Sequence, residues 1–329
     1  MSFGRIVIKF GTSTLTAGAP RLSPPHLIEL VRQIAHLHAA GKEVLVVSSG
    51  AIAAGRSRLN FPQLPKDIPA KQMLAAIGQP HLMALYEQLF GLYGLVVAQV
   101  LLTRADLSDR RRYLNSRNTL AAVLAQRAVP VINENDTVAT EEIRVGDNDN
   151  LSALVANLIE ADLLILLTDQ PGLFTADPRR SPDATLVNEV SEEEIPASLW
   201  QAAGGASNGL GTGGMVTKLQ AADLARRSGA TVVIASGSEP EVLIRLVSGQ
   251  AIGTRFLPVT SAVEGRKRYI LTGRGAAGKL WVDEGAVQAL HRGGSLLPVG
   301  LARVEGVFER GDPVSVLDPA GREIARGLA

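Results

Sequence analysis

Two clusters of short polar residues stand close together in the middle of the chain. Residues 133–136 (NEND) follow an apolar run over 129–132, and residues 146–150 (GDNDN) precede an apolar helical pattern that starts at Leu151. Because the first cluster is polar, we expect the buried strand to end before it. Asp and Asn favour helix caps and turns, so one cluster alone would leave the choice open. Two clusters that flank one strand–loop–helix passage favour a ligand site, which open α/β sheets place at such positions.

A lysine stands near the end of the first apolar run. Residues 5–10 (RIVIKF) predict a buried strand, and Lys9 is its next-to-last residue. A cation at the end of a buried strand is costly unless it meets an anion. The alternative is a lysine at the sheet edge whose long side chain carries the charge to solvent. Lys9 is therefore a candidate for binding an anion.

A glycine-rich stretch over 204–218 (GGASNGLGTGGMVTK) is a candidate for phosphate binding. Glycine lets the backbone approach a ligand closely and donate N–H groups to phosphate oxygens. We expect a helix over 218–228, whose N-terminal dipole favours anions, and Lys218 adds a positive charge there. The stretch is not a Walker A loop, because it lacks the Gly-Lys-Ser/Thr spacing and a preceding strand. A flexible linker is the alternative, and the lysine and helix that follow make it less favoured.

Further polar residues follow two other apolar runs, SSGA at 48–51 and TDQPG at 168–172. The chain has no cysteine, and none of its five histidines lies in a polar or glycine cluster, which excludes thiol chemistry and argues against a histidine-based site. Cations, glycines and Asx residues at strand and helix ends suit phosphoryl transfer, in which positioning and charge neutralisation supply most of the catalysis. A carboxylate acceptor suits best, because it is already an anion at neutral pH and needs no general base. The sequence therefore favours a kinase that forms an acyl phosphate.

Alternating strand and helix patterns surround these residues. We expect strands over 5–10, 43–47, 95–103, 129–132, 162–167 and 230–235. We expect helices over 24–39, 70–90, 108–126 and 218–228 and after residue 150, with a break or kink at 78–80 (GQP), a turn at 11–13, and a loop over 60–69. This order predicts an α/β fold with helices packed on a mainly parallel sheet. The strand exits would bring the polar residues to one edge of that sheet.

Composition and hydropathy limit the class of protein. The chain has 329 residues, of which 46% are hydrophobic and 4% aromatic, and its net charge is +1. A net charge this close to zero indicates neither a basic nucleic-acid-binding surface nor an acidic tail. No apolar run is long enough to span a membrane, and the start of the chain lacks a signal-peptide pattern, so we expect a soluble, cytoplasmic protein. Short strand patterns separated by glycines follow residue 268. We expect one domain over 1–260 and a small β-rich domain over 268–329.

Seven motifs together resemble the glutamate 5-kinase family: VIKFGTSTL, VVSSGAIAAG, LLTRAD, PVINENDTVA, VGDNDNLSALVA, LLTDQPGL and GLGTGGMVTKLQAAD. They occur in the family's order over about residues 5–255. The resemblance implies the amino-acid kinase fold, an αβα sandwich around a mainly parallel sheet. It also implies ATP-dependent phosphorylation of the γ-carboxylate of L-glutamate to γ-glutamyl phosphate, the first step of proline biosynthesis.

The same resemblance assigns roles to individual residues. Lys9 and Lys218 would flank the transferred phosphoryl group, and Asp149 would orient the two lysines. Ser49, Asp136 and Asn148 would hold the substrate glutamate. Asp136 would bind the ammonium group of glutamate, and Asn148 would bind one of its carboxylates. ATP would contact Lys9, Thr168, Asp169, Thr212, Gly213, Gly214, Met215, Val216, Thr217 and Lys218. Magnesium would bridge the nucleotide phosphates without a dedicated set of protein ligands.

The last segment resembles a PUA domain, a small β-barrel, through VDEGA and SLLP-G. The family usually continues beyond the position of Ala329, so we expect a truncated or shortened domain. Few aromatic residues accompany its basic ones, so we do not expect RNA binding. The resemblance further implies a dimer or tetramer, feedback inhibition by proline and transfer of the product to a glutamyl-phosphate reductase. Two alternatives remain: a related kinase acting on aspartate, acetylglutamate or a nucleoside monophosphate, and a catalytically inactive regulatory or RNA-binding protein.

Overall fold

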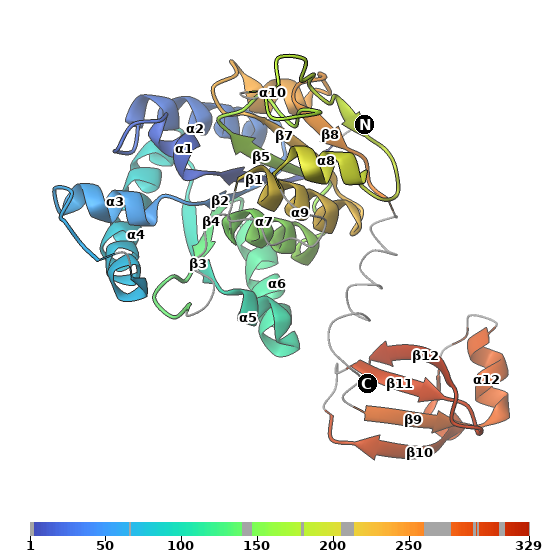
Figure 1. The fold of residues 1–329 in the computed structure, drawn as a ribbon. Coiled ribbons are helices and arrows are strands. Elements are labelled where there is room, and N and C mark those ends of the chain that lie inside the picture. Colours follow the sequence, from blue (N-terminus) through green and yellow to red (C-terminus); the bar gives the residue numbers. More distant parts are fainter. Residues whose placement is uncertain are drawn as a thin grey trace. The chain divides into compact units, whose positions relative to one another are not determined.

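The chain divides into two compact units, Met1–Ala262 and Val263–Ala329 (Figure 1). The computed structural model describes residues 3–65, 67–139, 147–178, 181–204, 214–259, 278–291, 294, 296–308 and 313–328. Within these residues no helix is both long and apolar enough to cross a membrane.

The larger unit is built on an eight-stranded sheet in the order β3-β4-β2-β1-β5-β7-β8-β6. Its strands are β1 (Arg5–Phe10), β2 (Glu43–Ser48), β3 (Val97–Leu102), β4 (Val129–Glu134), β5 (Leu163–Thr168), β6 (Glu189–Val190), β7 (Thr231–Ser236) and β8 (Thr254–Phe256). Its helices are α1 (Thr12–Thr16), α2 (Pro24–Ala39), α3 (Ala51–Arg58), α4 (Ile68–Gly91), α5 (Arg104–Ser108), α6 (Arg110–Ala125), α7 (Asp147–Leu158), α8 (Ala197–Ala202), α9 (Met215–Arg226) and α10 (Val242–Val247). The expected α/β class with a mainly parallel sheet is confirmed.

Parallel pairing gathers the strand exits at one edge of the sheet. All neighbouring strands run parallel except β7 and β8, which are antiparallel. The register places Lys9 of β1 opposite Val47 of β2 and Leu166 of β5. The last residues of β1, β2, β4 and β5 therefore lie at the carboxyl edge, where open α/β sheets bind ligands.

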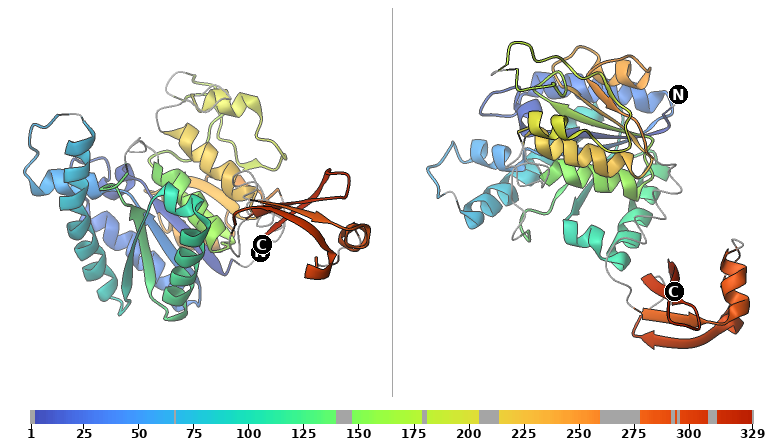
Figure 2. Two further views of the ribbon diagram at one scale, coloured as in Figure 1. Left: turned by 90° about the horizontal axis from the view of Figure 1, so that it is seen from below. Right: turned by 45° about the vertical axis from the view of Figure 1, so that its right-hand side comes forward.

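Each face of this sheet carries its own hydrophobic core, because successive strand residues point to opposite sides. Val7 packs in a core with buried residues of α6, α7, α8 and α9. Its neighbours Ile6 and Ile8 pack in a second core with α2, α4 and α10. Both turned views show the strands of this unit between helices (Figure 2). The expected αβα sandwich is thus observed, and its two helical layers hold the strand ends in place.

Several expected local features are wrong. The strand β4 does not end before the polar cluster, because Asn133 and Glu134 belong to it and are buried. The helix α4 runs unbroken through Pro80, and the expected turn after β1 is the short helix α1. The strands β6 and β8 and the C-terminal strand β12 were not expected. The last section of β4 tolerates polar residues because side-chain hydrogen bonds satisfy Asn133.

The smaller unit contains a four-stranded sheet in the order β10-β9-β11-β12. Its elements are β9 (Gly278–Val282), α12 (Glu284–His291), a 3-10 turn η1 (Pro298–Gly300), β10 (Leu301–Gly306), β11 (Pro313–Leu317) and β12 (Glu323–Leu328). The central strands β9 and β11 run parallel, and each pairs antiparallel with an outer strand. Its core is small, with Leu280, Val282, Val314 and Val316 buried.

Candidate active site

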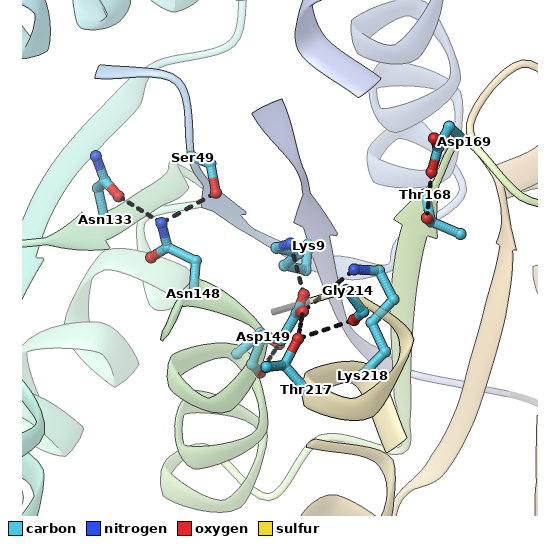
Figure 3. A network of polar contacts seen from close by, with 11 residues as sticks. Lys9, Ser49, Asn133, Asn148, Asp149, Thr168, Asp169, Gly214, Thr217 and Lys218 are labelled. Atoms are coloured by element: carbon cyan, nitrogen blue, oxygen red, sulfur yellow. Dashed lines mark hydrogen bonds and ion pairs between the residues drawn. The ribbon is translucent and has the colours of Figure 1, made fainter. Parts of the chain in front are cut away.

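Two lysines and one aspartate form a buried cluster at the carboxyl edge of the larger sheet (Figure 3). Lys9 lies near the end of β1, Asp149 at the start of α7 and Lys218 at the start of α9. The Nζ atom of Lys9 lies 2.5 Å from Oδ1 of Asp149, and Nζ of Lys218 lies 3.2 Å from Oδ2. The Asp149 side chain is only 1% exposed. One carboxylate therefore faces two ammonium groups, and the cluster carries an excess of one positive charge.

Burial and opposite charge compete within this cluster. Burial lowers the pKa of Lys9 below its ordinary value of 10.5, although the Asp149 carboxylate opposes that shift. Burial alone would raise the pKa of Asp149, but attraction by Lys9 and Lys218 brings it below 3.8. Asp149 is therefore an anion at neutral pH, and its charge opposes the effect of burial on the pKa of Lys9.

The start of α9 adds a hydroxyl to the cluster. The Thr217 Oγ1 atom lies 2.7 Å from Oδ2 of Asp149 and 2.9 Å from the Gly214 carbonyl oxygen. Gly214 precedes the helix with φ of 93°, a backbone conformation that glycine adopts without strain. This contact fixes the first turn of α9 against the Asp149 carboxylate. The helix N-terminus, whose dipole favours anions, therefore lies beside the two lysines.

Asn148, the residue before Asp149, starts a second group of polar contacts. Its Nδ2 donates to Oγ of Ser49, the residue after β2, and to Asn133 Oδ1 on β4, both at 3.1 Å. Asn133 Nδ2 in turn donates to Gln79 Oε1 of α4 at 2.8 Å. Because Asn148 and Asp149 are adjacent in α7, the amide group and the lysine cluster lie next to each other (Figure 3).

Asp136 lies in the turn that follows β4 and is partly buried. Burial raises its pKa to about 6. Among the residues that the structure describes, no hydrogen-bond or ion-pair partner faces its carboxylate. A half-buried carboxylate that meets no cation among the described residues is suited to receive one from a ligand.

The expected nucleotide-binding residues are only partly brought together. Thr168 ends β5, and its hydroxyl donates to Asp169 Oδ1 at 3.0 Å, apart from the lysine cluster (Figure 3). Thr212 and Gly213 lie outside the described residues. Met215 and Val216 begin α9, where the Val216 side chain is buried in the core and only its backbone can face a ligand.

Two residues of the site were not anticipated as functional. Asn133 belongs to the NEND cluster but received no role, and Gln79 was assigned only to a helix break. Both are buried and lie in the amide group beside Asn148. Their polar side chains within otherwise apolar segments could have indicated a role, because a buried polar side chain has a hydrogen-bond partner.

Residues 4–236 match the model of the Amino acid kinase family, and residues 278–329 match that of the PUA domain. A glutamate 5-kinase of Photobacterium profundum is 57% identical over 324 residues, which is 98% of this chain and 85% of that protein. A glutamate 5-kinase of Shewanella amazonensis is 58% identical over 328 residues, 99% of this chain and 86% of that protein. The chain belongs to the glutamate 5-kinases of the amino acid kinase family.

The fold of this glutamate 5-kinase family member extends to distant structures. The UMP kinase of Bacillus anthracis matches with a TM-score of 0.53 over 79% of this chain and 98% of its own, at 15% identity. At that identity the likeness shows the shared fold alone. Within the described residues, no group of three or more His, Asp or Glu side chains could hold a metal ion. The site offers two lysines, one positioning carboxylate and the N-terminus of α9, a set that binds phosphate and carboxylate groups.

Proposed function

We propose that the protein transfers the γ-phosphoryl group of ATP to the γ-carboxylate of L-glutamate and so forms γ-glutamyl phosphate, the first step of proline biosynthesis. The buried Lys9–Asp149–Lys218 cluster carries this proposal. Likeness to glutamate 5-kinases over 98–99% of this chain supports the choice of acceptor.

The reaction brings two anions together, and the lysines offset their repulsion. A carboxylate oxygen of glutamate forms a bond to the γ-phosphorus, while the bond from that phosphorus to the bridging oxygen breaks and ADP leaves. No proton has to move, because the acceptor is already ionised at neutral pH. Lys9 and Lys218 stabilise the charge on the transferring group, and Asp149 holds both ammonium groups in place.

The substrates occupy the two sides of this cluster in the proposed arrangement. Glutamate lies toward Ser49, Asp136 and Asn148, with its ammonium group near Asp136. ATP lies toward Thr168, Asp169 and the start of α9, including Thr212, Gly213, Gly214, Met215, Val216 and Thr217. Magnesium bound between the nucleotide phosphates would neutralise part of their charge, a mode that needs few protein ligands.

A panel of acceptors tests this function. ADP release from ATP and Mg²⁺ is measured with glutamate, aspartate, acetylglutamate and UMP as separate acceptors. We expect turnover with glutamate alone. Turnover with another acceptor would leave the lysine roles intact and overturn the substrate, and no turnover in a folded sample would favour the regulatory alternative.

We also propose, from the likeness to glutamate 5-kinases, that proline inhibits the enzyme at or near the glutamate pocket. The assembly into dimers or tetramers and transfer of the labile product to a reductase belong to the same proposal. Proline titration at fixed glutamate checks the first point, and unchanged activity at saturating proline would contradict it. Sedimentation analysis checks the oligomeric state.

A further inference from the structure

Three side-chain amides form a hydrogen-bonded chain whose direction is set by the backbone. The backbone N–H of Glu134 donates to Asn133 Oδ1 at 2.9 Å. An N–H can only donate, so the atom that it contacts must be the carbonyl oxygen of Asn133 and the other atom must be Nδ2. Asn133 Nδ2 then requires an acceptor, which fixes Gln79 with Oε1 toward it at 2.8 Å. The backbone N–H of Glu134 therefore determines, through Asn133, which of the two amide atoms of Gln79 faces Asn133.

The same logic fixes Asn148. Asn133 Oδ1 is an acceptor, so the Asn148 atom that faces it at 3.1 Å must be Nδ2. The second hydrogen of Nδ2 goes to Ser49 Oγ, also at 3.1 Å. Both donors of Asn148 are used within the protein, and among the described residues its buried Oδ1 atom has no hydrogen-bond partner. Asn148 thus offers an acceptor atom, which suits an ammonium group and not the carboxylate that the family resemblance assigned to this residue.

Gln79 is held firmly in position by its own helix. The next residue toward the N-terminus, Gly78, packs so closely on α3 that an added Cβ would lie 1.8 Å from the Ala51 carbonyl oxygen and 2.4 Å from the Gly55 amide nitrogen. Ala51 begins α3, two residues after Ser49. The backbone of α4 at this point therefore packs tightly against α3, whose first residue lies two positions after Ser49, and Gln79 is a rigid support for the amide chain.

We propose that Gln79 is a positioning residue for the acceptor: through Asn133 it holds Asn148 with Oδ1 free to accept a hydrogen bond from the acceptor's ammonium group. This inference rests on the proposed function, because it assigns an ammonium group to the substrate. An ammonium has three N–H donors, so Asp136 and Asn148 can each receive one. The carboxylate of Asp136 attracts the ammonium group by its charge, and the neutral Oδ1 atom of Asn148 orients that group through a hydrogen bond.

The test compares two ligands that differ only in the amino group. L-Glutamate and glutarate have the same chain length and two carboxylates, and only glutamate carries an ammonium group. Their dissociation constants are measured by calorimetry for the wild type and for Gln79→Met, which fills similar volume but cannot hold Asn133. We expect the preference for glutamate over glutarate to fall about fivefold or more, as for the loss of one oriented hydrogen bond. Glutarate affinity should change less than about twofold by the same reasoning.

Two further variants keep the comparison decisive. Gln79→Asn retains an amide but is one carbon too short to reach Asn133, and it should show the same loss of preference. Gln33→Met removes a buried glutamine of α2 whose amide nitrogen and oxygen each make a hydrogen bond outside the amide chain, and it controls for a general loss of stability. It should leave the preference unchanged.

An unchanged glutamate-to-glutarate preference in either Gln79 variant would overturn the role of Gln79, as would equal losses for both ligands. Failure of the wild type to bind glutamate at all would instead contradict the proposed function, so the two failures are distinguishable.

Discussion

Replacing Asp149 by Asn removes the charge at the centre of the lysine cluster and changes its shape very little. Two buried ammonium groups, at 2.5 and 3.2 Å from this carboxylate, would then face each other without their common counterion. Removal of one partner from a buried ion pair costs about 3–5 kcal/mol, against a total stability of about 5–15 kcal/mol for a typical domain. We therefore expect Asp149→Asn to lose about a fifth or more of the free energy of unfolding of the larger unit.

The sign of the pH dependence of stability determines the pH at which wild type and variant should be compared. The folded-state pKa of Asp149 lies below its ordinary value of 3.8. Its ionisation therefore contributes stability that is present above the ordinary value and is lost as the pH falls through the lower folded-state value. A comparison at pH 7 measures the whole contribution, and the difference between wild type and variant should shrink below pH 4.

Urea unfolding followed by circular dichroism at 222 nm measures the effect, because most helices belong to the larger unit. With a urea dependence of about 3 kcal/mol per M, the midpoint should fall by about 1–2 M. ATP should restore part of the loss, since its phosphates provide the missing anions. Turnover should fall about 100-fold or more, because the lysines lose the group that positions them.

The matched control is Asp223→Asn in α9. Asp223 pairs with Arg227 four residues along α9 at 2.8 Å, with side chains 26% and 47% exposed, and such a helix pair contributes about 0.3–0.5 kcal/mol. Its urea midpoint and turnover should stay near those of the wild type. If Asp149→Asn unfolded at the wild-type midpoint and turned over within a few-fold of the wild type, the account of the lysine cluster would be wrong.

Three other changes test separate parts of the site. Lys218→Ala should cut turnover by orders of magnitude while circular dichroism shows a folded protein; comparable turnover would remove Lys218 from the mechanism. The KM for glutamate should fall as the pH rises through about 6, because only ionised Asp136 attracts the ammonium group, and Asp136→Asn should abolish that dependence in initial-rate measurements. Gly78→Ala should lower the melting temperature strongly, because its Cβ would clash with Ala51, whereas Gly91→Ala on the same helix has open space and should not.

The strands that hold the site could be predicted because their residues are almost all apolar. The strands β1, β2, β5 and β7 have continuous apolar runs typical of a buried parallel sheet, and each was expected within a residue or two of its observed bounds. The strands β6 and β8 have two and three residues. Their pairing depends on long-range contacts, and so short a segment carries no periodicity of its own.

The polar residues of the site show a similar limit. Lys9 and Lys218 could be singled out because a cation beside an apolar strand or a glycine-rich loop needs a partner. Their joint contact with Asp149 spans large separations in sequence, and no local pattern reveals such a contact. Gln79 was missed because its neighbours, Gly78 and Pro80, are helix breakers in isolation. In the structure Gly78 allows α4 to approach α3 closely, and this contact can be recognised only in the folded protein.

Hydroxylamine trapping tests the central claim most directly. The purified protein is incubated with ATP, Mg²⁺ and L-glutamate in the presence of hydroxylamine, which converts an acyl phosphate to a stable hydroxamate, and Lys218→Ala is treated in the same way. We expect γ-glutamyl hydroxamate to form in proportion to ADP with the wild type and to be nearly absent with the variant. ADP release without hydroxamate, or hydroxamate formation that does not depend on Lys218, would contradict transfer of the phosphoryl group to the glutamate carboxylate at this lysine cluster.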